Sequence, residues 1–296
     1  MSKPVCSLMA ILLAATASQA APLKALIVDG QNNHAWQQTT PVLKKLLEET
    51  GLFTVDVATS PPKGADMSGF KPDFARYTVI VLNYNGEAWP AETEAAFEKY
   101  VRGGGGVVVY HAADNAFTQW KAYNEMIAVG GWGGRTPSFG KALRFRDGKV
   151  VLDTPAYNCG HHAQRLPFQV TTRDANHPIM KGLPPVWMHV GDELYDTLCG
   201  PAQDVDVLAT AHSDPANKGT DQNEPMLMAI RYGKGRIFHT TLGHDVAATE
   251  CVGFITTFDR GTEWAATGKV TQKVPKDFPT ADKVSLRPLG AQAAQR

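Results

Sequence analysis

Three histidines of this chain stand at the ends of apolar, strand-like runs. His34 follows "LIVDG", His111 follows "VVVY" and His244 follows "IFHTTLG". Imidazoles that converge with a carboxylate can shuttle protons or bind a transition metal. A single histidine is more often a hydrogen-bonded structural residue, and the sequence has no HExxH or CxxC motif. The pattern predicts an acid/base centre, and His34, His111 and His244 could also hold a divalent metal ion as cofactor.

Two carboxylates accompany these histidines. Asp114 lies three residues after His111, and Glu193 stands in "DELY", directly after "WMHVG". Glu193 fits an exposed acidic turn and a general acid/base or metal ligand equally well on sequence alone.

Side chains suited to holding a sugar occur in the same segments. Aromatic faces pack against the C–H faces of sugar rings, and neighbouring amides bind hydroxyls. The candidates for substrate binding are Asn33, His34, Trp36, Asn83, Tyr84 and Trp132. The glycines at 103–106 precede a strand and do not open a helix, so they do not form a phosphate-binding loop.

Strands alternate with helices between residues 23 and 112. Apolar runs at 23–30, 53–60, 77–86 and 106–112 predict strands, and segments 39–51 and 90–104 have helical spacing. This alternation is typical of an α/β fold with a parallel sheet and helices on both faces. Ligands bind beyond the carboxyl ends of such strands, so the candidate residues should meet at one edge.

The rest of the chain is less regular. The segment from Gly130 to Pro201 is rich in glycine and proline, which predicts an elaborated loop region that could form a lid. Apolar runs at 205–212 and 226–244 restore regular structure, the second as a hairpin turning at "YGKG". The last helix is expected over 249–268. We place one domain at residues 21–270, before a polar C-terminal tail at 271–296.

Residues 1–20 have the pattern of a secretory signal peptide. One lysine precedes an apolar run from Leu8 to Ala17, and "SQA" provides a small-x-small cleavage site after Ala20. The run is too short to span a bilayer. We therefore expect a secreted or periplasmic protein that is not inserted in a membrane after cleavage.

The mature chain would retain Cys159, Cys199 and Cys251, so at most one disulfide can form. We expect it between Cys159 and Cys199, because both lie in loop-like sequence and an oxidising compartment permits the bond. None of the three has the context of a catalytic nucleophile.

The charge balance limits the partners. The 296 residues include 29 basic and 29 acidic side chains, so the formal net charge is zero. Without a basic field, nucleic acid is not an expected partner. A small sugar is, and the sequence leaves open whether copies of the chain form a homo-oligomer.

Several motifs in order resemble the ThuA-like (trehalose-utilisation) family. They are "FEKYVRGGGGVVVYHAADNAF", "HPIMKGLPPVWMHVGDELY", "EPMLMAIRYGKGRIFHTTLGHD" and "GTEWAATGKV", and the resemblance extends from Leu23 to Val270. It implies a class I glutamine amidotransferase-like fold, which is a flavodoxin-like, doubly wound, mostly parallel α/β sheet. In amidotransferases of that superfamily a cysteine nucleophile occupies the elbow after the glycine turn. His111 stands at that position here, so glutamine hydrolysis is not expected.

The resemblance also implies a substrate and site residues. ThuA-like proteins are associated with catabolism of trehalose and related disaccharides, often beside oxidoreductases that make 3-keto sugars. The implied substrate is a disaccharide or 3-keto-glycoside. The positions that match the family's motif are His111, Asp114, Glu193 and His244, with His34 a further candidate. We assign Glu193 or His111 as base, Asp114 as its orienting partner and His244 as ligand or acid.

Three kinds of function are compatible with the sequence. The first is an enzyme that hydrolyses, eliminates or isomerises a keto-sugar or glycoside, and it is the one we favour. The others are a non-catalytic carbohydrate-binding module on a scaffold without the nucleophilic cysteine, and an interaction subunit. Convergence of His34, His111, Glu193 and His244 at the strand ends would favour the enzyme.

Overall fold

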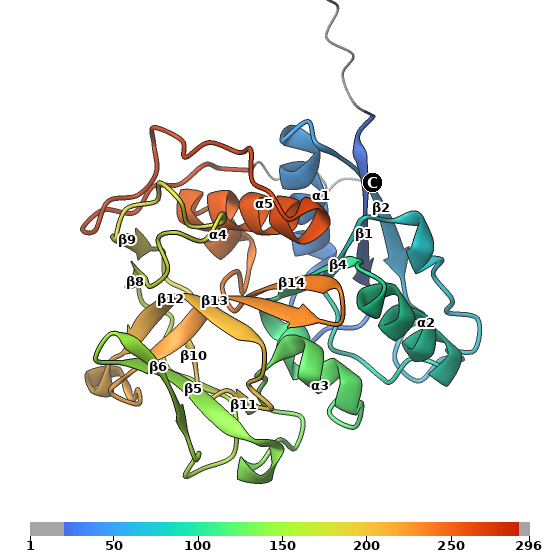
Figure 1. Ribbon diagram of the computed structural model, residues 1–296, viewed down its shortest axis with the longest axis horizontal. Coiled ribbons are helices and arrows are strands. Elements are labelled where there is room, and N and C mark those ends of the chain that lie inside the picture. The colour runs from blue at the N-terminus through green and yellow to red at the C-terminus, as the bar shows by residue number, and fades with distance from the viewer. Residues whose placement is uncertain (1–20, 290–296) are drawn as a thin grey trace, which may run out of the picture.

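A computed structural model describes residues 21–289 of the chain (Figure 1). The expected signal peptide at 1–20 and the end of the expected tail, 290–296, lie outside the described residues. Between these limits, no helix combines the length and the apolar character that a membrane crossing requires.

A nine-stranded sheet forms the centre of the molecule, in the order β2-β1-β3-β4-β14-β13-β12-β8-β9. From β2 to β14 neighbouring strands pair in parallel, and from β14 to β9 they pair antiparallel. The strands are β1 (Leu23–Asp29), β2 (Phe53–Thr59), β3 (Val79–Leu82), β4 (Gly106–Tyr110), β8 (Phe168–Thr172), β9 (Val186–His189), β12 (Val205–Ser213), β13 (Gln222–Tyr232) and β14 (Gly235–Thr240). The predicted α/β architecture with a large central sheet is confirmed, with the strands parallel from β2 to β14, and the hairpin over 226–244 is confirmed as well.

Helices cover both faces of this sheet (Figure 1). They are α1 (Trp36–Glu49), α2 (Ala91–Arg102), α3 (Lys121–Ile127), α4 (Val246–Thr249) and α5 (Val252–Thr267), with short 3-10 turns η1 (Phe74–Arg76), η2 (His111–Asn115), η3 (Pro137–Phe139) and η4 (Pro215–Asn217). In β1, Ala25 and Ile27 pack in the core beneath α1 and α5, whereas Leu26 and Val28 pack in the core beneath α2 and α3. Burial on both faces explains why the parallel strands read as continuous apolar runs.

The region expected to be elaborated loops contains two small sheets as well as β8 and β9. One has the order β11-β5-β6 and the other pairs β10 with β7. Their strands are β5 (Lys141–Arg146), β6 (Lys149–Asp153), β7 (His161–His162), β10 (Tyr195–Asp196) and β11 (Cys199–Gly200). The sequence did not predict these strands, because most of them are short, lie in glycine-rich segments and pair with distant parts of the chain.

The described part of the C-terminal segment packs against the rest of the domain. The Glu263 carboxylate in α5 accepts hydrogen bonds from the Thr271 amide and hydroxyl, both at 2.7 Å. Phe278 and Leu289 pack against the core beneath α1 and α5.

Candidate active site

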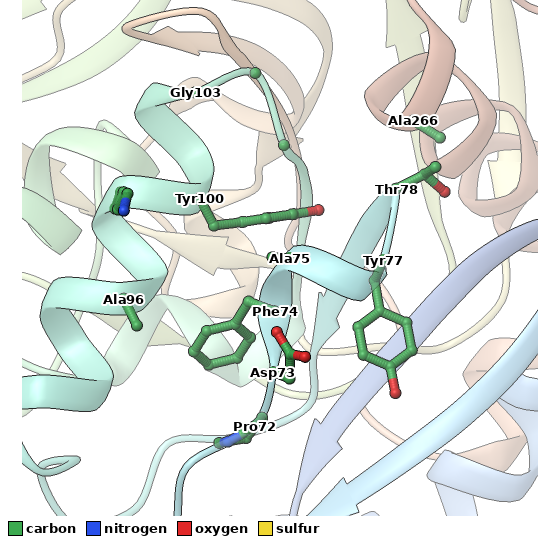
Figure 2. Close-up of a pocket in the computed structure, with 13 residues that line it drawn as sticks. Pro72, Asp73, Phe74, Ala75, Tyr77, Thr78, Ala96, Tyr100, Gly103 and Ala266 are labelled. Atoms are coloured by element: carbon green, nitrogen blue, oxygen red, sulfur yellow. The ribbon is translucent and has the colours of Figure 1, made fainter.

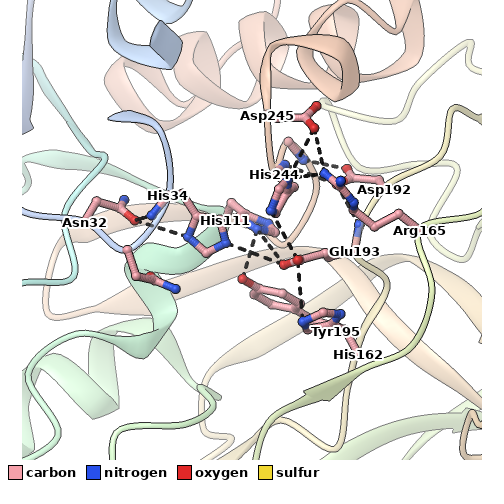
Figure 3. A network of polar contacts seen from close by, with 12 residues as sticks. Asn32, His34, His111, His162, Arg165, Asp192, Glu193, Tyr195, His244 and Asp245 are labelled. Atoms are coloured by element: carbon pink, nitrogen blue, oxygen red, sulfur yellow. Dashed lines mark hydrogen bonds and ion pairs between the residues drawn. The ribbon is translucent and has the colours of Figure 1, made fainter. Parts of the chain in front are cut away.

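Four of the predicted site residues meet at the carboxyl ends of the parallel strands (Figure 3). His34 follows β1, His111 follows β4 and His244 follows β14, while Glu193 comes from the loop after β9. Glu193 Oε2 lies 3.5 Å from the Nε2 atoms of both His34 and His111, and Glu193 Oε1 lies 3.2 Å from His244 Nε2. A fourth imidazole, that of His162, has its Nε2 atom 3.5 Å from Oε1. One carboxylate thus contacts four histidines.

His111 occupies a sharp elbow between β4 and η2. Its φ of +44° lies in the left-handed region, which is uncommon for a residue with a side chain and concentrates at functional sites. The ring is fixed on both sides, because Nδ1 donates to the Thr241 carbonyl at 2.6 Å and the Tyr195 hydroxyl donates to Nε2 at 2.9 Å. Ala112 and Ala113 behind it are fully buried, so only small residues fit the turn.

His34 is also held in one tautomer. Its Nδ1 atom donates to Asn32 Oδ1 at 3.2 Å, which leaves the Nε2 lone pair facing Glu193. His244 has the opposite tautomer. A guanidinium can only donate, so the contact of Arg165 Nη1 with His244 Nδ1 at 2.9 Å places the ring proton on Nε2, toward Glu193.

This arrangement fits a divalent cation. The ligand atoms of His34, His111 and Glu193 lie within 4.8 Å of one another. Metal-binding histidines normally donate their other ring N–H to an oxygen, as His34 and His111 do here to Asn32 and Thr241. His244 does not join this set, because its Nε2 atom carries the proton.

The electrostatics keep Glu193 ionised. Burial alone would raise the pKa of Glu193, but its contacts with the imidazoles of His111 and His34 hold that pKa well below the usual range. Burial lowers the pKa of His34, which stays neutral near pH 7. Burial also opposes charging of His111, yet its contacts with Glu193 and the nearby Asp192 raise its pKa.

A pocket of about 330 Å³ opens beside Glu193. It is lined by Asn33, His34, Asn85, Asn115, Trp132, Gly133, His162, Glu193 and Tyr195. Three of the predicted substrate-binding residues, Asn33, His34 and Trp132, are therefore in it. Trp36 lies outside and lines an adjoining hollow, whose walls share Asn33 and Asn85 with this pocket.

The structure corrects two substrate-binding predictions. Asn83 is buried and donates through Nδ2 to the hydroxyls of Thr39 and Thr40, each at 3.0 Å. Tyr84 is buried too, and its hydroxyl donates to the Glu87 carbonyl at 2.7 Å. Both follow β3 at the correct edge, but their side chains turn into the protein and join α1 and the following loop to the sheet.

Asp114 does not orient His111, contrary to the prediction. The η2 turn carries it beneath the site, where Oδ2 lies 3.5 Å from His239 Nε2 and neither carboxylate oxygen has a hydrogen-bond partner among the described residues. The Thr241 carbonyl orients His111 instead. A backbone carbonyl leaves no trace in the residue types, so the sequence could not predict it.

Tyr195, His162 and Asp192 are site residues that sequence reasoning missed. Tyr195 and His162 are directly opposite each other in the β7–β10 pair. Alternation in "DELY" offered a signal for Tyr195, because residues 193 and 195 of an extended segment share a face. Asp192 lies behind the site and accepts hydrogen bonds from the backbone amides of Glu193, Gly243 and His244 at 2.8, 2.7 and 3.1 Å.

A disulfide joins Cys159 and Cys199, as expected, and leaves the buried Cys251 free. The Cys159 carbonyl accepts from the Trp132 amide at 2.7 Å. This hydrogen bond ties the loop that carries Trp132 to the loop that carries Cys159 and His162.

Another hollow, of about 610 Å³, lies at the opposite ends of the strands (Figure 2). Phe74, Tyr77 and Tyr100 line it together with the glycines that precede β4. Its lining includes no histidine, and Asp73 is its only carboxylate. Of these two hollows, only the pocket at the carboxyl ends of the strands contains the cluster of histidines around Glu193.

Comparison with known proteins decides the family. A family model described as trehalose utilisation matches residues 24–265. The chain belongs to the ThuA family. The solved structure of a ThuA-like protein from Parabacteroides merdae is 49% identical, with a TM-score of 0.89 over 90% of this chain and 98% of that one. A ThuA-like protein from Bacteroides uniformis, 20% identical, shares the fold, with a TM-score of 0.57 over 86% of this chain and 95% of that one. No curated protein matches the sequence.

Proposed function

We propose that this ThuA-family protein is an enzyme of sugar catabolism that acts on a disaccharide or 3-keto-glycoside by acid/base chemistry. The observation that carries the proposal is the convergence of four imidazoles on the Glu193 carboxylate beside a pocket walled by amides and Trp132. Family membership supports a role in trehalose utilisation.

A keto group at C3 of a sugar makes the neighbouring C2 proton acidic. We assign its removal to His34, whose Nε2 lone pair faces the pocket. His34 thus takes the role of base that the sequence suggested for Glu193 or His111. Glu193 is held too acidic to be an efficient base, and its charge instead stabilises the imidazolium of His34. His111 is buried, and Tyr195 already occupies its Nε2 atom.

The electrons of the broken C–H bond pass to the carbonyl oxygen, which becomes an enolate. Tyr195 lines the pocket, and burial together with the charges of Asp114 and Glu193 raises its pKa well above the ordinary value. Its hydroxyl therefore stays protonated, and it can donate to the enolate oxygen by turning from His111 to the substrate. Return of the electron pair expels the glycosidic oxygen at C1, which takes the proton held by His34. Reprotonation of the carbon instead gives an isomer.

A divalent metal ion held by His34, His111 and Glu193 would take the same Nε2 atoms, so it would replace the base role of His34 described above. Such an ion would polarise the sugar carbonyl as a Lewis acid.

The test is incubation of the protein with a 3-keto disaccharide in D₂O, followed by NMR. We expect loss of the C2 proton signal and appearance of product, and we expect His34→Gln to abolish both. His212→Gln is the matched control, because the His212 side chain is exposed and pairs with Asp221, not with Glu193. Calorimetric binding without exchange or product would instead support the binding module.

We also propose that the protein is exported and cleaved after Ala20. The N-terminal pattern supports this, and so does the disulfide, since such bonds persist in oxidising compartments. Mass spectrometry of the native protein should find Ala21 at its N-terminus; an intact Met1 would refute export.

Finally, we infer that the parallel half of the sheet is a flavodoxin-like, doubly wound core. The order β2-β1-β3-β4-β14 supports this assignment, because it has the 2-1-3-4-5 pattern of such sheets.

A further inference from the structure

Strand β6 has an open edge and an apolar face. It is the last strand of the β11-β5-β6 sheet, and no strand within residues 21–289 pairs with its outer side. Val150 and Leu152 point to one face and are 42% and 50% exposed. An exposed apolar edge strand is a template for pairing with another chain.

The hairpin that presents β6 is firmly held. Its turn consists of Asp147 and Gly148, both with positive φ, which is the preferred geometry for a two-residue hairpin. In β5, the buried Arg144 contacts Glu224 of β13 at 2.6 Å. The edge is therefore presented by an ordered element.

The sequence of β6, "KVVLD", is self-complementary in one antiparallel register. If two copies pair with Val151 at the centre, Lys149 of each lies opposite Asp153 of the other, and Val150 lies opposite Leu152. Asp153 also pairs with Arg146 of its own hairpin, so Lys149 of the second copy would join an existing ion pair. Symmetry makes each pair occur twice. Directly opposed charges of opposite sign and directly opposed aliphatic residues both stabilise a strand pair.

Other registers lose this match. A shift of one residue brings the apolar face of one strand against the polar face of the other. A shift of two places Lys149 opposite Val151 and removes the charge pairs. Only the register centred on Val151 satisfies both faces.

We propose that the protein forms a two-fold homodimer by antiparallel pairing of β6 with β6 of a second copy. The two three-stranded sheets then join into one sheet of six strands. The dimer goes beyond the proposed function, because β6 contributes no residue to the pocket beside Glu193.

Charge reversal tests the register by analytical ultracentrifugation of the full chain. We expect the wild type to sediment as a dimer, and Lys149→Glu and Asp153→Lys each to weaken dimerisation at least ten-fold. Asp153→Lys also removes the ion pair with Arg146, so Lys149→Glu is the cleaner of the two variants. An equimolar mixture of the two variants should form dimers again, because every reversed charge then faces an opposite one. Lys121→Glu makes the same charge change on α3, where the side chain is 91% exposed, and should leave the dimer intact.

Near-UV circular dichroism checks that each variant is folded. Should a charge variant unfold, Val150→Thr with Leu152→Thr removes the apolar pairs and should also yield monomers. A wild type that is monomeric at every concentration overturns the proposal. So does a dimer that all these folded variants retain.

Discussion

At the scale of single residues, one carboxylate organises the candidate site. Glu193 contacts His34, His111, His162 and His244, and the contacts act in both directions. His111 and His34 keep Glu193 ionised, and the charge of Glu193 in turn favours protonation of His111. The protonation states of Glu193 and His111 are therefore linked.

Glu193→Gln should lower the pKa of His111 and reduce turnover of a keto-sugar about 100-fold or more. The substitution removes the charge that favours protonation of the His111 ring, and it nearly preserves the shape of side chain 193. An NMR titration of the imidazole signals measures the first effect without any substrate. An unchanged His111 titration would contradict the linkage.

His111→Asn should abolish measurable turnover while the protein stays folded. Asparagine tolerates the positive φ of the elbow but cannot present a ring nitrogen to Tyr195. Product formation and thermal unfolding should be measured on the same preparation. Wild-type turnover in this variant would show that His111 has no part in the chemistry.

At the scale of elements, buried Asp192 connects two loops that carry site residues. Its carboxylate binds the amides of Glu193, Gly243 and His244, and it pairs with His189 of β9, with 2.8 Å between Nε2 and Oδ2. The loop after β9 and the loop after β14 are thus held by one side chain, which sets the positions of Glu193 and His244.

Asp192→Asn should lower the free energy of unfolding by about 3 kcal/mol, because it leaves a buried histidine without its counter-charge. Urea denaturation measures this loss. Asp221→Asn is a suitable control: that carboxylate pairs with His212 at the surface, and its loss should cost about 1 kcal/mol or less. Equal effects of the two substitutions would argue against the role of Asp192.

The same pair predicts how stability depends on pH. Burial alone would lower the pKa of His189, but Cys251 and Asp192 raise it from 6.5 to about 9. Protonated His189 therefore stabilises the folded state below pH 6.5, and this contribution is lost as the pH rises toward 9. The loss is on the order of 3 kcal/mol. Denaturation curves across this range should show the decline in the wild type, and His189→Gln should flatten it.

At the scale of the whole molecule, the disulfide connects the added strands to the pocket. Cys159 and Cys199 are 40 residues apart in sequence, and the intervening segment contains His162, Glu193 and Tyr195. The bond thus closes the part of the chain that completes the site around the parallel sheet.

Replacing both cysteines with serine should lower the free energy of unfolding by about 4 kcal/mol, the chain-entropy value for a loop of this length. Urea denaturation of the double variant, with and without reductant, measures the change. Reductant should destabilise the wild type and leave the variant unaffected. Equal stability of the oxidised wild type and the variant would contradict the prediction.

The sequence by itself determined the parallel half of the fold and the edge at which the site lies. Short-range periodicity encodes strands and helices, and the rule that ligands bind at carboxyl strand ends located His34, His111 and His244. It also predicted the pairing of Cys159 with Cys199. These features depend on local patterns or on a small number of alternatives.

Only the tertiary structure decided which polar side chains face the pocket. Asn83, Tyr84 and Asp114 have suitable types and positions, but they turn inward to Thr39, Glu87 and His239, which are distant or unremarkable in sequence. Tyr195 and His162 meet because β7 pairs with β10 across more than thirty residues. Side-chain direction at a strand end depends on such long-range contacts, and residue type alone does not encode them.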